Sequence, residues 1–165
     1  MDISTSLAGI IHLETPIYNA SGPRCTTREE LYALNNSESA AILTKSCTVE
    51  PRLGNPGIRY WDNDIMSINS TGLANLGYKF YGEQSGFSKP YFVSIAGLSL
   101  EDNLEIVKEL DQDHISSIEL NLSCPNISGK PQVAYDYEMI ETYLRKIYDV
   151  CVYVDNLGYN RMPFF

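Results

Sequence analysis

The sequence is poor in basic residues, and those it has are not clustered. Its 12 Lys and Arg residues are scattered among 21 Asp and Glu residues, which gives a formal charge of −9 at pH 7. Proteins that bind nucleic acid gather Lys and Arg against the phosphate backbone. The sequence therefore predicts no nucleic-acid partner.

Long hydrophobic runs are absent as well. No stretch approaches the roughly 18 apolar residues that a membrane-spanning helix needs. The opening MDISTSLAGIIHLETPIYNASG also lacks a basic segment followed by a long apolar one, the pattern of a secretory signal. We expect a soluble, cytoplasmic protein with no membrane partner.

Metal-binding patterns are missing too. The sequence contains no CxxC pair, and neither histidine is next to a cysteine, which makes a zinc site improbable. Nothing indicates an oxidising compartment, so free thiols are predicted, most of them acting as small buried hydrophobic side chains. The four cysteines are Cys25, Cys47, Cys124 and Cys151, and the two histidines are His12 and His114.

What the chain does contain is typical of a folded domain. Hydrophobic residues make up 44% of its 165 residues and charged residues 20%, far from the composition of a disordered chain. Ser99 and Asp102 form a capping pattern that predicts a helix over 100–113. Apolar residues three and four apart predict another over 136–151, and a shorter helix is expected after Thr27.

Short apolar runs between these helices predict strands at 17–21, 40–46, 91–97 and 117–123. Strands that alternate with helices form a parallel sheet, with functional residues at the carboxyl ends of the strands. The pattern fits a (β/α) barrel and equally a small doubly wound sheet. The connection over 47–90 is long for a compact domain, and a loop of that length is usually functional.

Polar residues do follow the predicted strands. Lys45 and Ser46 close the second strand, Ser94 lies late in the third, and Asn121, Ser123 and Cys124 close the fourth. Pro125 restricts the backbone directly after Cys124, which helps to preorganise a site. A reachable thiolate at this position could act as nucleophile or base, although from spacing alone a structural thiol is the stronger alternative.

Five motifs together resemble the soluble, fumarate-reducing dihydroorotate dehydrogenases: TKSCT at 44–48, GNPGIRY at 54–60, SINSTGLANLGY at 67–78, NLSCPN at 121–126 and GKPQVAYD at 129–136. The resemblance runs from about Ala8 to about Asp149. It implies a (β/α)8 TIM barrel that binds FMN and oxidises dihydroorotate to orotate in pyrimidine biosynthesis. It also implies fumarate as the electron acceptor and a homodimeric assembly.

The resemblance also implies roles for individual residues. Cys124 matches the base that takes a ring proton, and Lys45 matches the cation beside the flavin and the substrate carboxylate. Asparagine offers both a donor and an acceptor to a dihydropyrimidine ring. The remaining substrate positions are Asn69, Ser70, Thr71, Gly72, Leu73, Asn121 and Asn126. The cofactor positions are Ser21, Gly22, Lys45, Ser46 and Asn121, although NASG at 19–22 also suits a simple strand-to-helix turn.

The last residues depart from the family pattern. Residues 151–165 begin like another strand, and the sequence that follows in the family does not appear in register. We therefore expect residues 1–165 to form the N-terminal part of one barrel domain, with about the first four to five βα units and an aberrant tail at 151–165. The alternative is a truncated, non-catalytic half-barrel that binds no flavin and acts at most as an assembly or interaction fragment.

Overall fold

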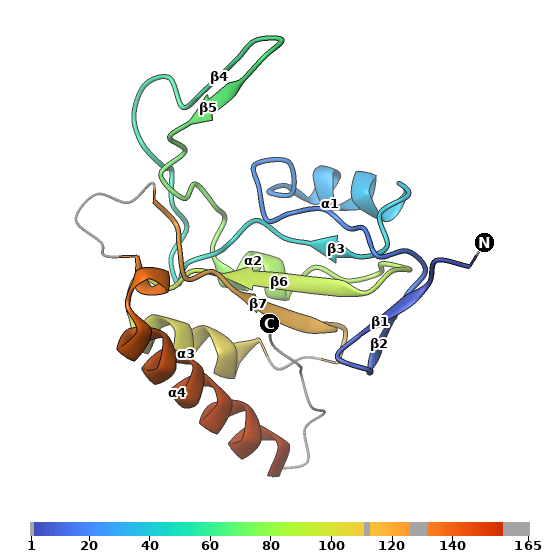
Figure 1. Cartoon of the computed structure of the whole chain (residues 1–165), viewed down its shortest axis with the longest axis vertical. Coiled ribbons are helices and arrows are strands. Elements are labelled where there is room, and N and C mark those ends of the chain that lie inside the picture. Colours follow the sequence, from blue (N-terminus) through green and yellow to red (C-terminus); the bar gives the residue numbers. More distant parts are fainter. Residues whose placement is uncertain (1, 111–112, 126–131, 157–165) are drawn as a thin grey trace.

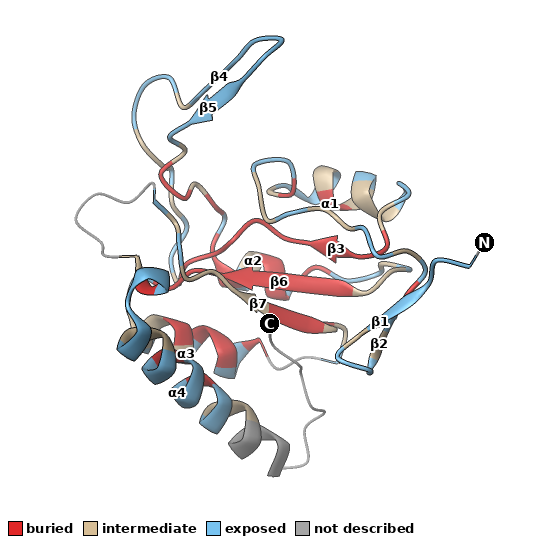
Figure 2. Cartoon of the chain, in the orientation of Figure 1, coloured by how far each residue is buried: buried red, intermediate tan, exposed pale blue. Residues whose placement is uncertain are grey.

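A parallel sheet lies at the centre of the computed structural model, which describes residues 2–110, 113–125 and 132–156, with side chains up to Cys151. The three strands lie in the order β3–β6–β7 and pair in parallel. β3 and β6 are fully buried, as strands covered on both faces should be (Figure 2). Their bounds are Ile42–Leu43, Tyr91–Ile95 and Ser117–Leu120.

The three predicted helices are confirmed. In α1, Arg28–Asn35, the Thr27 side chain accepts a hydrogen bond from the backbone of Glu30, and the Glu30 side chain completes the capping box. In α3, Leu100–Glu109, Ser99 accepts from the backbone N–H of Asp102. α3 packs against α4, Tyr137–Asn156, on one side of the sheet (Figure 1).

The strand predicted at 17–21 is wrong, although the segment does lie beside β3. The Asn19 side chain takes the place of a backbone ladder: its Nδ2 donates to the Leu43 carbonyl at 2.7 Å, and its Oδ1 accepts from the Leu43 N–H at 2.9 Å. The N–H of Ala40 donates to the Ile17 carbonyl at 3.0 Å. A side chain that satisfies a strand edge leaves no repeating backbone pairing, so no strand forms there.

The strand expected to begin at Cys151 is also wrong. α4 continues through these residues to Asn156. Extending a helix that has already formed costs far less than starting a new element, so the apolar run CVYV joins the helix despite its β propensity. The rest of the predicted tail, 157–165, lies outside the described residues.

Two hairpins and two short helices were not predicted, one of the helices being the 3-10 helix η1, Val133–Tyr135. β1, Thr5–Leu7, pairs with β2, Ile11–Leu13, near the N-terminus. The long connection contains α2, Tyr78–Gly82, and the hairpin of β4, Tyr60–Asp62, and β5, Ser67–Asn69. Every residue of that hairpin is exposed, and Figure 1 shows it projecting from the body of the chain.

Candidate active site

The polar residues at the carboxyl ends of the three central strands form one hydrogen-bonded group. Asn121 Nδ2 donates to Ser46 Oγ at 3.0 Å, and the hydroxyls of Ser46 and Ser94 lie 2.9 Å apart. Ser94 Oγ then donates to Glu119 Oε1 at 3.0 Å. Ser46 and Ser94 are fully buried. This chain of contacts joins β3, β6 and β7 at the edge of the sheet where α/β proteins place their ligands.

Lys45 supplies a buried cation to the same edge. Only 9% of its surface is exposed, and its Nζ donates to the carbonyl of Ser21 at 3.0 Å. Burial lowers the pKa of the Lys45 ammonium, and the neighbouring thiols of Cys25 and Cys124 partly oppose that shift. The predicted cofactor residues Ser21, Lys45 and Ser46 are therefore close together.

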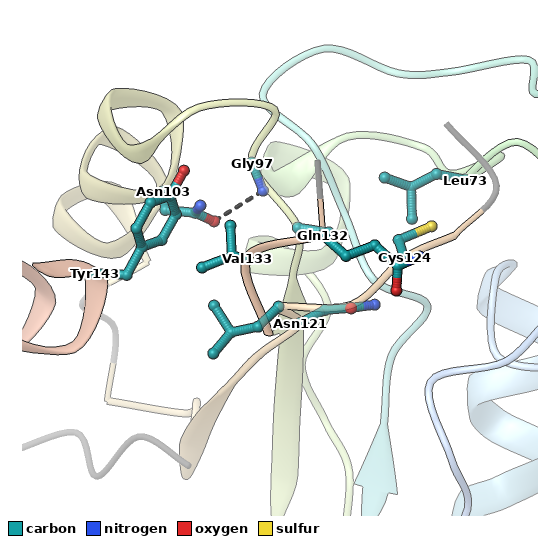
Figure 3. A pocket seen from close by; sticks show the side chains of 10 residues that line it. Leu73, Gly97, Asn103, Asn121, Cys124, Gln132, Val133 and Tyr143 are labelled. Carbon is teal, nitrogen blue, oxygen red and sulfur yellow. Dashed lines mark hydrogen bonds between the residues drawn. The ribbon is translucent and has the colours of Figure 1, made fainter. Parts of the chain in front are cut away.

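A small pocket contains the predicted base. Cys124 is half-buried and lines this pocket with Leu73 and Asn121. Figure 3 shows Leu73 and Cys124 at one end of the pocket and Asn103 and Tyr143 at the other. Three residues of the prediction therefore meet in one place, from two segments about 50 residues apart in the sequence.

The loop that carries Leu73 is held in an uncommon conformation. Leu73 has a φ of 58°, in the left-handed region that bulky residues rarely adopt. Asn75, which is buried, stabilises it by donating from Nδ2 to the Leu73 carbonyl at 2.8 Å. The Asn75 Oδ1 also accepts from the backbone of Thr48 and Gly77. One amide therefore ties the pocket wall to the segment that follows β3.

Gly72 must be glycine for two reasons. Its φ is 67°, and a Cβ at this position would lie 2.4 Å from both the backbone nitrogen and Oδ1 of Asn55. Asn55 also binds the neighbouring loop residues: its N–H donates to the Thr71 carbonyl at 3.2 Å and its Nδ2 to Ser70 Oγ at 3.0 Å. The segment 70–73 is thus packed tightly against residue 55.

The other predicted site residues are less closely placed. Asn69 ends the exposed strand β5, and the adjacent Ser70 is exposed as well, so neither lines the pocket. Gly22 is half-buried in the turn next to Ser21, where its N–H donates to the Ala20 carbonyl at 2.8 Å. Asn126 lies outside the described residues.

Sequence reasoning assigned no role to two polar residues of this group. Glu119 and Ser94 complete the hydrogen-bonded chain, and both face the carboxyl edge of the sheet from its neighbouring strands. The available signal was a charged residue inside the otherwise apolar run SIEL, which a buried strand does not need for packing. Gln132, which also lines the pocket, has no comparable signal in the sequence.

Two classes of feature are not found in the described residues. No group of three or more His, Cys, Asp or Glu side chains is placed to hold a metal ion there. In the same part of the chain, every helix is too short or too polar to cross a membrane.

Comparison with known proteins identifies the family. The profile of dihydroorotate dehydrogenase matches residues 3–155. Dihydroorotate dehydrogenase (fumarate) of Trypanosoma brucei brucei is 44% identical over 158 residues, which cover 91% of this chain and 50% of that protein. Dihydroorotate dehydrogenase A (fumarate) of Lactococcus lactis subsp. lactis is 42% identical, with the same coverage.

The fold agrees with that family. A crystal structure of the Eimeria tenella enzyme in complex with ferulenol superposes with a TM-score of 0.72 at 17% sequence identity, covering 93% of this chain and 45% of that one. Of the two predicted architectures, the barrel is therefore confirmed and the doubly wound sheet is not. The chain has the fold of part of a TIM barrel. The chain spans about half the length of the curated relatives it matches. It belongs to the dihydroorotate dehydrogenase family.

Proposed function

We propose that this chain provides the FMN and substrate contacts of an enzyme that oxidises (S)-dihydroorotate to orotate with fumarate as acceptor, a step of de novo pyrimidine (UMP) biosynthesis. One observation carries the proposal. Lys45, Ser46, Asn121 and Cys124, which the family motifs assign to flavin, substrate and base, gather at the carboxyl ends of adjacent parallel strands.

The donor set suits FMN. Lys45 is a buried cation of the kind that would stabilise an anionic reduced flavin, and its burial is otherwise unfavourable. Asn121 would add an amide contact and Ser46 would hold that amide from behind, with Ser21 and Gly22 on the turn beside Lys45. When bound, FMN would supply the hydride acceptor that no protein side chain can replace.

The chain's own part in the reaction is proton transfer and orientation. Cys124, whose side chain is half-buried, would act as the base and accept the proton of the ring carbon adjacent to the one that loses hydride. Asn121 would hold the ring through its amide, with Leu73 and Gly72 at the pocket wall. Asn69, Ser70, Thr71 and Asn126 complete the proposed substrate set. By resemblance, the enzyme would act as a cytoplasmic homodimer.

The alternative function, a non-catalytic half-barrel that acts as an assembly or interaction fragment, is favoured by one observation. Within the described residues, β7 pairs with β6 on one side and has no strand on the other. An unpaired edge can add a strand from another chain. A folded chain that takes up no FMN and forms no orotate would support this alternative and contradict the enzyme.

The catalytic proposal is tested by two cysteine variants. The chain is supplied with FMN, dihydroorotate and fumarate, and orotate formation is followed by absorbance. Cys124→Ala should abolish orotate formation while flavin stays bound. Cys151→Ala is the matched control, because Cys151 is also half-buried but packs against the hydrophobic core. Turnover by Cys124→Ala near that of the control would refute Cys124 as the base.

A further inference from the structure

The hydrogen-bonded chain at the strand ends has a defined direction, and Glu119 sets it. A carboxylate can only accept hydrogen bonds. Ser94 therefore gives its one hydroxyl hydrogen to Glu119 Oε1, at 3.0 Å. Ser94 Oγ is then left as an acceptor for Ser46, whose hydroxyl lies 2.9 Å away.

The same constraint passes on to Asn121. Because Ser46 donates its hydrogen to Ser94, its Oγ can only accept a hydrogen bond from its other partner, Asn121. Asn121 must present its Nδ2 to Ser46, which it does at 3.0 Å. The amide oxygen is consistent with this orientation, since Asn121 Oδ1 accepts from the backbone N–H of Ser123 at 3.1 Å. Both ends of the Asn121 amide are therefore determined.

We propose that Glu119 is a positioning residue that fixes the Asn121 amide, and with it the order of donor and acceptor that the pocket offers to a ring. Among the described residues, the Asn121 amide is bonded to Ser46 and Ser123, which leaves one Nδ2 hydrogen and one Oδ1 lone pair for a ligand. It lines the same pocket as Cys124 (Figure 3). A fixed donor and acceptor pair selects a cyclic amide edge in one orientation over its hydrogen-bonding inverse.

Burial strengthens this series of hydrogen bonds. Ser46 and Ser94 have no exposed surface, so water does not compete for their hydroxyls. Glu119 and Asn121, the two ends of the series of hydrogen bonds, are half-buried on the carboxyl-terminal side of β7. The three strands also hold the register of these residues through the pairing of Ser94 with Glu119. Ser94 and Glu119 lie in paired strands, so the orientation is anchored in the sheet.

The positioning role is tested first on the ligand-free chain, by NMR of the Asn121 side-chain amide. In the native chain, the Nδ2 hydrogen bound to Ser46 should be protected from solvent exchange. Glu119→Gln keeps the shape but can donate as well as accept, so the direction is no longer imposed. Its Asn121 signals should shift, and the protection should fall by about fivefold, the ratio that one net hydrogen bond corresponds to. Ser94→Ala should do the same with Glu119 in place.

Glu105→Gln, on the exposed surface of α3, is the control for loss of one acidic charge and should leave the Asn121 signals unchanged. The proposal is overturned if Glu119→Gln folds with native Asn121 signals and protection. Loss of the fold in that variant would equally overturn it, by making Glu119 structural.

The specificity part rests on the proposed function and is measured separately. In the FMN-loaded chain, Glu119→Gln should weaken orotate binding about fivefold while FMN binding is retained. Unchanged orotate affinity would refute the specificity role. A chain that binds neither FMN nor orotate refutes the proposed function instead, and the NMR result on the free chain still decides whether Glu119 orients Asn121.

Discussion

Lys45→Met tests whether the strand-end site is kept for a ligand or for stability. Lys45 is 9% exposed, and in the described part of the chain its Nζ makes one hydrogen bond, to the Ser21 carbonyl at 3.0 Å. Burial already lowers the pKa of the ammonium, which shows that the charged form is unfavourable there. Methionine has a similar length and shape without the charge.

The expected change follows from two opposing effects. Taking an ammonium out of water costs several kcal/mol in a protein, even after relaxation. A hydrogen bond from a charged group returns about 1.5–3 kcal/mol. The Ser21 carbonyl is only half-buried, so water can replace the lost donor. Lys45→Met should therefore raise the free energy of unfolding by about 1–2 kcal/mol.

Urea denaturation at pH 7, followed by circular dichroism, measures this change, with Lys89→Met as the matched control. Lys89 Nζ donates to the Leu34 carbonyl at 3.3 Å and to the Ser37 carbonyl, at the C-terminal end of α1. A cation stabilises that end of a helix, so the control should lose about 1 kcal/mol. If Lys45→Met also loses 1 kcal/mol or more, Lys45 is structural and the reasoning is refuted.

Three further changes test the pocket wall and the core, each by urea denaturation. Gly72→Ala should lower the free energy of unfolding by about 2–4 kcal/mol, because the methyl group would meet Asn55 at 2.4 Å; a loss under 1 kcal/mol would contradict the tight packing of this loop. Asn75→Ala should cost about 3 kcal/mol, since buried partners of its amide are left unpaired, and a neutral effect would show that water replaces it. Burial raises the pKa of Cys47 from the ordinary 9.0 to about 12, so the folded chain keeps a proton that the unfolded chain releases, and stability should fall as the pH rises from 9 to 12. Cys47→Ala should flatten that fall by about 1.4 kcal/mol per pH unit, and equal slopes would disprove the raised pKa.

Local signals predicted the elements whose ends are determined by nearby residues. Thr27 and Ser99 cap helices within one turn, so their sequence patterns and their structures agree. Residues 17–21 were predicted wrongly because a contact distant in sequence decides them, and residues 151–156 because the state of the preceding helix outweighs their own β propensity. The Asn19 side chain pairs with Leu43, and the preceding helix carries the chain past Cys151.

The candidate site also has a part that the sequence predicts and a part that it does not. Lys45, Asn121 and Cys124 each follow a buried strand, and parallel strands bring such residues together, so their proximity could be expected. The link between Ser94 and Glu119 depends on the register of β6 with β7, which no local pattern reveals. The left-handed backbone of Leu73 is likewise set by Asn75 and by packing around residue 55.

Titration of the purified chain with FMN, followed by flavin fluorescence, is the most direct test of the central claim that the strand-end site serves a flavin enzyme. We predict saturable binding of one FMN per chain, weakened about tenfold or more by Lys45→Met, as expected for loss of one charged contact. A folded chain that binds no FMN, or that binds it equally well with methionine in place of Lys45, would contradict the account.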